Sequence, residues 1–285
     1  ILDRKKDKKQ IKELFDRYHV GGCRYEHGDA EAIYELNDYF QQVSKIPVLI
    51  ACNCNSGGDG ACSDGTHIAT AAACGASGDE KVSYDTGYVS GKESTAIGCN
   101  WNFGPVCDIL YNWRNTIVNS RAYGNNPDQV LKHCKAYIEG MRKSPIAVCC
   151  KHFPGDGVDY RDQHLMTTVN SLSEEMWKQY HGKVFAELIK KGVACIMPGH
   201  ITLPFYQKER INGYLPPATL SHELLTGLLK KEMHFNGVVV SDAMTMAGFR
   251  GWYKNDLEGQ VASFLAGVDI LLSLIHISEP TRRTP

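Results

Sequence analysis

The stretch IAVCCKHFPGDGVDYRDQH, residues Ile146 to His164, decides the fold. Its first part, IAVCC, is apolar without alternation, which is typical of a strand covered on both faces in a parallel sheet. Its second part begins at Lys151 and holds three Asp, two His, one Lys and one Arg, together with Gly and Pro. A buried strand that ends in so many titratable groups predicts a site at the end of that strand.

Further apolar runs of this kind recur along the chain, and each one ends in polar or Gly-rich residues. Together with 146–152, the predicted strands are 20–25, 47–53, 99–108, 193–200, 237–244 and 266–272. These seven runs are short and continuous, so they fit strands packed between two layers better than strands of an exposed sheet.

Helical patterns alternate with these strands. The predicted helices are 29–44, 84–96, 127–143, 172–191, 219–233 and 256–265. Strand and helix in alternation, with right-handed crossovers, give a parallel sheet. We therefore predict an α/β fold, a TIM-type (β/α)8 barrel that lacks its first strand in this chain. An open doubly wound sheet is the alternative, although no GxGxxG follows the first strand.

Bulk composition excludes several classes of function. The chain has 285 residues, 43% of them hydrophobic and 22% charged, with a formal net charge of −1. This balance predicts no nucleic-acid partner and no membrane surface, and no apolar run approaches the roughly 18–20 residues of a membrane span. The eleven Cys include no CxxC pair, so we expect reduced thiols and a cytoplasmic protein, with export left undecided.

The two ends of the sequence do not fit the repeating pattern. The chain opens ILDRKKDKKQ without Met, as if it began inside a domain, and it closes with SLIHISEPTRRTP. The closing string resembles the translation of a common sequencing-library adapter. We expect residues 1–272 to form an incomplete catalytic barrel and residues 273–285 to be a non-native tail from a truncated metagenomic, bacterial gene. A natural disordered tail is the alternative.

Polar side chains stand where the predicted strands end. They are Asn53, Asp108, Lys151, His152, His200, Ser241 and Asp242. In an α/β barrel these carboxyl ends of the strands carry the chemistry. Asp162 and His164 lie two residues apart in the loop after 146–152, where a carboxylate can fix the tautomer of an imidazole that donates and accepts protons. An isolated pair of this kind is more often a solvated loop His beside an Asp.

The motifs resemble those of the family 3 glycoside hydrolases, in their β-N-acetylglucosaminidase branch. KHFPGDGVDYRDQH is similar to that family's signature loop, which reads roughly KHFPGHGDTxxDSH. GVVVSDAMTM resembles the strand that carries the family's nucleophile, and NSRAYG resembles its SRSFG element. PVLIACNCNSGG and CNWNFGPVCD match further elements in the family's order. The resemblance covers about residues 15 to 272.

This resemblance implies a retaining exo-glycosidase that removes non-reducing terminal β-linked N-acetylglucosamine from a glycan or glycopeptide. Asp242 would attack the anomeric carbon, and His164, oriented by Asp162, would act as acid and then as base. Sugar hydroxyls would be bound by Lys151, His152, Arg121 and Asn53. No metal and no cofactor are implied.

Departures from the motif leave alternatives open. Asp156 replaces a motif His, Val158 and Asp159 replace its Asp-Thr, and Asn53 stands where the family often has a sugar-binding Asp. The alternatives are a β-glucosidase of the same family, a phosphorylase that uses phosphate as acceptor, and an inactive sugar-binding barrel. A hydrolase that holds a metal with His152, Asp156 and their loop neighbours is less favoured, because such ligands are more often spread over several strand ends.

Overall fold

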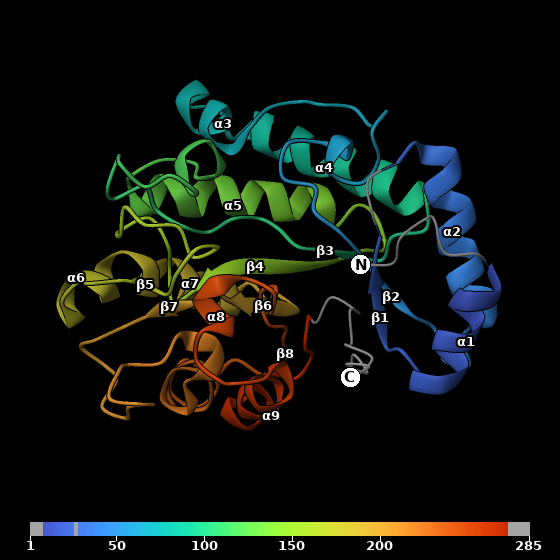
Figure 1. The fold of residues 1–285 in the computed structure, drawn as a ribbon. Coiled ribbons are helices and arrows are strands. Elements are labelled where there is room, and N and C mark those ends of the chain that lie inside the picture. Colours follow the sequence, from blue (N-terminus) through green and yellow to red (C-terminus); the bar gives the residue numbers. More distant parts are fainter. Residues whose placement is uncertain (1–7, 26–27, 273–285) are drawn as a thin grey trace, which may run out of the picture.

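A computed structural model describes residues 8–25 and 28–272 of the chain (Figure 1). The predicted tail, residues 273–285, lies outside the described residues. The strands are β1 (Gly22–Arg24), β2 (Leu49–Cys52), β3 (Trp101–Asn102), β4 (Ala147–Phe153), β5 (Thr168–Val169), β6 (Cys195–Pro198), β7 (Ile201–Thr202) and β8 (Val238–Val239). The α-helices are α1 (Lys8–Tyr18), α2 (Ala30–Val43), α3 (Ala71–Ser77), α4 (Glu80–Ala96), α5 (Pro127–Met141), α6 (Glu174–Gln179), α7 (His181–Lys190), α8 (Ala247–Arg250) and α9 (Asp256–Ala266). Shorter turns are the 3-10 helices η1 (Gly58–Gly60), η2 (Asn119–Arg121) and η3 (Ala218–Leu220), and η4 (Glu223–Glu232) is a π-helix.

The main sheet is parallel and has the strand order β1-β2-β3-β4-β6-β8. Each neighbouring pair is in parallel register, as in Ala51 opposite Trp101 and Cys149 opposite Cys195. Helices cover the outside of the sheet, and α4 packs along α5 over one flank (Figure 1). The curled parallel sheet with its outer helices confirms the predicted barrel-type α/β fold.

Successive residues of β4 face two different apolar environments, which explains why its sequence does not alternate. Val148 and Cys150 belong to the large core between sheet and helices. Cys149 belongs instead to an inner cluster with Trp101 and Met197. Because both faces of the strand are buried, an apolar residue is favoured at every position.

Three predicted elements differ from the structure. The predicted helix 172–191 is broken at Tyr180 into α6 and α7. Trp177 packs into this break, and its indole N–H donates to the Pro154 carbonyl at 2.8 Å. Gly182 lies so close to the Trp177 ring that a Cβ atom at this position would be only 2.7 Å from the ring. The predicted helix 219–233 is η3 followed by the π-helix η4. The predicted strand 266–272 makes only one bridge, from Ile270 to Val240.

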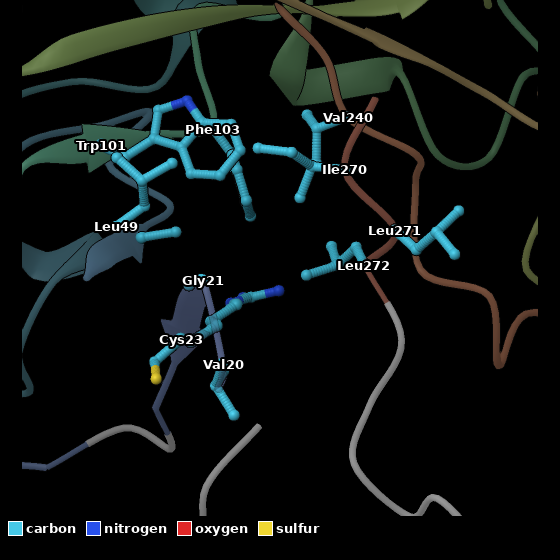
Figure 2. Close-up of a pocket in the computed structure, with 13 residues that line it drawn as sticks. Val20, Gly21, Cys23, Leu49, Trp101, Phe103, Val240, Ile270, Leu271 and Leu272 are labelled. Atoms are coloured by element: carbon cyan, nitrogen blue, oxygen red, sulfur yellow. The ribbon is translucent and has the colours of Figure 1, made fainter. Parts of the chain in front are cut away.

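An apolar cavity of about 270 Å³ lies between the two edges of the main sheet (Figure 2). Val20 and Cys23 line one side, Ile270 and Leu272 line the other, and Trp101 lies at the upper left of the view. Within residues 8–25 and 28–272, β1 pairs only with β2. The sheet is therefore open between the strands near Val20 and Leu272.

All eleven Cys side chains are buried thiols without a disulfide bond. In the part of the chain that the structure describes, no helix combines the length and the apolarity needed to cross a bilayer.

The aromatic contact between α7 and β4 should carry a large share of the stability. Phe185 is fully buried, and its ring meets the Phe153 ring edge-on, with centroids 5.3 Å apart. We expect Phe185→Ala to lower the free energy of unfolding by about 3–5 kcal/mol, because it removes buried surface and leaves a cavity. Denaturant unfolding measures this loss.

The matched control is Phe264→Ala, since the Phe264 side chain is 60% exposed. It should change the free energy of unfolding by no more than about 0.5 kcal/mol. Equal losses for the two variants would contradict this account of the core.

Candidate functional site

Side chains from the carboxyl ends of three strands meet at one end of the sheet. Lys151 and His152 close β4, and Asn53 follows β2 directly. Lys151 donates from Nζ to Asn53 Oδ1 at 2.6 Å. His152 Nε2 lies 3.8 Å from Asp242 Oδ2, which follows β8. The structure therefore brings together the predicted residues Asn53, Lys151, His152 and Asp242.

Asp108, after β3, fixes the turn that follows Lys151. Its carboxylate is completely buried and accepts from the His152 amide at 3.1 Å and from the Asp156 amide at 2.8 Å. Its second oxygen lies 2.7 Å from His152 Nδ1. Burial alone would raise the pKa of Asp108, but the imidazole and the two amides hold this pKa below its usual value. The ionised carboxylate aims the far nitrogen of His152 at Asp242.

Asp242 is a carboxylate held in its charged form. Its side chain is 14% exposed, and its Oδ1 accepts from the Ala243 amide at 2.7 Å. Burial raises the pKa of Asp242. The charges of His152, His200 and Lys151 and the Ala243 amide together lower it by more than burial raises it, so the pKa lies below the usual value. Among the described residues, Oδ2 accepts no hydrogen bond, because His152 at 3.8 Å is beyond that range.

Lys151 is unusual because its ammonium is almost fully buried, with 3% of the residue exposed. Burial lowers its pKa, the charge of Arg121 lowers it further, and the pKa falls to about 7. To a smaller extent, the charge of Asp242 raises the pKa of Lys151 and the charge of Arg24 lowers it. Arg121, at the end of η2, thus lies within electrostatic range of Lys151, although none of the described residues is hydrogen-bonded to its guanidinium.

Asp162 and His164 form a pair on the loop between β4 and β5. Asp162 Oδ1 lies 2.6 Å from His164 Nδ1 and accepts from the His164 amide at 2.8 Å. The two side chains are 24% and 49% exposed, so the pair faces solvent. Within the described part of the chain, no hydrogen bond or ion pair joins His164 to Asp242.

His200 connects the loop pair to the strand ends. Its Nε2 lies 3.1 Å from the Ala243 carbonyl and its Nδ1 lies 2.9 Å from Thr219 Oγ1. Burial lowers the pKa of His200. To a smaller extent, the charge of Asp242 raises this pKa, and His152 and His164 lower it. His164 and Asp242 are therefore both within electrostatic range of one buried imidazole.

The sequence interpretation missed two buried residues beside this site. Gln163 stands between Asp162 and His164 but is only 1% exposed, and Asn115 donates to Asp156 Oδ1 at 3.1 Å. The sequence presents Asp156 as a departure from a motif and as a ligand in the less favoured metal site, whereas the residue is 2% exposed and its carboxyl contacts both Asn115 and Gln163. Both residues lie in loops between strands, where no helical or strand period predicts which side chains are buried.

Among residues 8–25 and 28–272, no group of three or more His, Cys, Asp and Glu side chains is arranged to hold a metal ion. His152, Asp156 and Asp162 are engaged instead with Asp108, Asn115 and His164, respectively.

The family model of the glycosyl hydrolase family 3 N terminal domain matches residues 2–280. A β-N-acetylglucosaminidase/β-glucosidase from Cellulomonas fimi is 38% identical over 234 residues, which cover 81% of this chain and 42% of the relative. A family 3 β-N-acetylglucosaminidase structure from Paenibacillus sp. str. FPU-7 is 29% identical with a TM-score of 0.84, and the match covers 94% of this chain and 51% of that one.

A second kind of enzyme is equally similar in structure. The β-glucoside phosphorylase BglX, bound to 2FGlc, is 36% identical with a TM-score of 0.86, and the match covers 92% of this chain and 48% of that chain. The chain spans about half or less of the length of these relatives.

The buried Lys151 amine should make stability depend on pH. Its pKa is about 7 in the folded protein, against 10.5 for a free lysine side chain, so between these values the unfolded chain binds more protons. This group therefore makes the wild-type protein more stable as pH rises from 7 towards 10. We expect the advantage of Lys151→Met over wild type in unfolding free energy to shrink from pH 7 to pH 9.5, as measured by urea unfolding.

Lys178→Met is the control, because Lys178 is exposed and its pKa is raised by the hydrogen bond that it donates to Glu174. Stability from a raised lysine pKa is fully present below the unfolded value, so the control difference should stay constant from pH 7 to pH 9.5. A constant difference for Lys151→Met as well would show that its amine is not perturbed.

Proposed function

The chain belongs to the glycosyl hydrolase family 3 N terminal domain family, and on that premise we propose that residues 1–272 form the catalytic barrel of a retaining exo-glycosidase. Its substrate would be a glycan or glycopeptide with non-reducing terminal β-linked N-acetylglucosamine. The observation that carries the proposal is the partly buried, ionised Asp242 beside His152, with the Asp162–His164 pair on the adjoining loop.

In the proposed mechanism, Asp242 is the nucleophile. Its Oδ1 is fixed by the Ala243 amide, and its Oδ2 is left to attack the anomeric carbon. A carboxylate whose pKa is lowered by its neighbours is charged at neutral pH, as a nucleophile must be. The product of this step is a glycosyl ester on Asp242, and the leaving oxygen departs with a proton.

His164 supplies that proton and later removes one from the attacking water. Asp162 holds the Nδ1 side of the imidazole at 2.6 Å, so Nε2 on the opposite side of the ring would be the atom that exchanges protons with substrate. A histidine oriented in this way can act first as acid and then as base. Loop movement would bring it over the glycosidic oxygen, since catalytic contacts often tighten only when substrate is bound.

Sugar hydroxyls would be bound by the polar cluster at the strand ends. Lys151 and Asn53 already bond to each other, and His152 and Arg121 lie beside them. A lysine near its own pKa can donate to hydroxyl oxygens without the full cost of a buried charge. The names of the Cellulomonas fimi and Paenibacillus relatives favour N-acetylglucosamine as the sugar. The buried free thiols suit a reducing, cytoplasmic setting.

A phosphorylase is the second candidate, and the likeness to two β-glucoside phosphorylase structures favours it. Phosphate would attack the glycosyl ester in place of water, so that a sugar 1-phosphate leaves and the Asp242 carboxylate is regenerated. Arg121 and Arg24 supply positive charge at this end of the sheet, and Lys151 adds to it when it is protonated. An imidazole carries no negative charge in either protonation state, so it would not repel the phosphate.

The nucleophile can be tested with two aryl glycosides. We expect release of 4-nitrophenol from the β-N-acetylglucosaminide, and a loss of about 10³-fold or more in Asp242→Ala, because the variant lacks the carboxylate that forms the ester. Asp85, whose side chain is 45% exposed, is replaced by Ala as the control and should retain full activity. Parallel assays with the β-glucoside and with added phosphate identify the sugar and the acceptor.

Release from the β-glucoside alone would replace the N-acetylglucosamine assignment. Release that depends on phosphate would favour the phosphorylase, and no release by the folded wild-type chain under either condition would overturn the enzymatic proposal.

The acid role of His164 predicts a dependence on the leaving group. We expect His164→Ala to lower turnover of an alkyl or disaccharide substrate by about 10²–10⁴-fold, and to slow the first step on 4-nitrophenyl glycosides much less, since that leaving group needs no proton. Burst kinetics separate the two steps. His222→Ala, at the exposed position that directly precedes η4, is the control. Equal losses on both substrates would exclude His164 as the acid.

A further inference from the structure

The side chain of Gln163 faces inward although its two neighbours face out. Asp162 and His164 have 24% and 49% of their side chains exposed, whereas Gln163 is 1% exposed. Gln163 Oε1 accepts from the His200 amide at 2.7 Å, and its Nε2 donates to Asp156 Oδ2 at 3.2 Å. A side-chain amide is both donor and acceptor, so one residue satisfies both partners.

Hydrogen bonds fix Asp156 beside the residues at the strand ends. Its amide donates to Asp108 Oδ1 at 2.8 Å, and its carbonyl oxygen lies 2.9 Å from His181 Nε2. Its Oδ1 accepts from the Gly157 amide at 2.7 Å and from Asn115 at 3.1 Å. The remaining oxygen, Oδ2, is the one that faces Gln163.

Both anchors of Gln163 are tied to residues that face Asp242. Asp108, which holds Asp156, also holds His152 at 2.7 Å. His200, which donates to Gln163, contacts the Ala243 carbonyl at 3.1 Å. Gln163 therefore connects the loop that carries His164, through Asp156 and through His200, to residues next to Asp242.

We propose that Asp156 and Gln163 form a latch that sets the position of the Asp162–His164 pair relative to Asp242. The inference rests on the proposed function, because it assigns these two as positioning residues for the His164 acid/base. Misplacement of a catalytic group by about 1 Å can cost on the order of 10²-fold in rate. The other ion pair on this loop, Arg161 with Asp159, has 36% of the arginine side chain exposed and would hold it less firmly.

The polarity of the latch can be reversed without removing it. Asp156→Asn alone places the new side-chain NH₂ group opposite the NH₂ group of Gln163, so that two donors face each other. Rotating the Gln163 amide by 180° would remove that conflict, but it would place the Gln163 NH₂ group against the donating His200 amide. Gln163→Glu alone places a carboxylate against the Asp156 carboxylate. The double variant Asp156→Asn/Gln163→Glu lets the new amide donate to the new carboxylate, which still accepts from His200, and it keeps the net charge.

The test is a double-mutant cycle read out in two ways. We expect each single variant to lower turnover of an N-acetylglucosamine disaccharide at least about tenfold more than the first step on the 4-nitrophenyl glycoside. Amide hydrogens of residues 159–166 should exchange faster in each single variant. The double variant should recover turnover to within about threefold of wild type, with exchange close to wild type, because the two sites are coupled.

Gln207→Glu is the matched control, since Gln207 is 5% exposed and similarly joins Leu203 and Pro216, each at 2.7 Å. It should lower stability without changing the ratio of the two activities or the exchange of residues 159–166. Single variants that leave both this ratio and loop exchange unchanged, or a double variant no better than the singles, would overturn the latch.

The two proposals can fail separately. If His164→Ala lowers both activities equally, the acid role fails, whereas hydrogen exchange in the cycle still decides whether the latch orders the loop. Faster exchange with an unchanged activity ratio would show a loop contact without a positioning role.

Discussion

The site depends on the burial of one charged group, the Asp108 carboxylate. Removing a carboxylate from water is expensive unless hydrogen bonds and an opposite charge replace the lost hydration. Asp108 obtains these from a single turn of chain, through the His152 ring and the amides of His152 and Asp156. Because the charge cannot be left unpaired, it forces the segment after β4 to fold over it. The orientation of His152 towards Asp242 follows from that constraint.

The other charged groups at the strand ends are balanced against one another. Burial and Asp108 raise the pKa of Asp156 to about 7, while burial and Arg121 lower the pKa of Lys151 to about 7. Asp242 instead stays ionised, because His152, His200 and Lys151 surround it. Three carboxyl groups of similar intrinsic acidity therefore differ because of their surroundings. Asp108 and Asp242 are charged, whereas Asp156 titrates near neutral pH.

The fold and the position of the site were predictable because both follow from local patterns. Strands buried on two faces give continuous apolar runs, and parallel strands bring their carboxyl ends together, so Asn53, Lys151 and Asp242 could be placed from sequence. The break at Tyr180 follows instead from packing, as Trp177 shows, and packing between distant segments leaves no periodic signal. The contact between Asp156 and Gln163 joins two loop residues through side-chain geometry, which spacing alone does not encode.

A histidine is a reasonable acid for a site so rich in buried carboxyl groups. Asp108 and Asp156 are linked through a hydrogen bond, and Asp242 faces the same His152 that Asp108 holds. A further carboxylate brought over Asp242 by the loop would raise the pKa of its neighbours and oppose the charged form that a nucleophile needs. An imidazole brings no negative charge, so it can approach Asp242 without this electrostatic cost. In the proposed mechanism the same property leaves room for an anionic acceptor, which is why water and phosphate both suit the site.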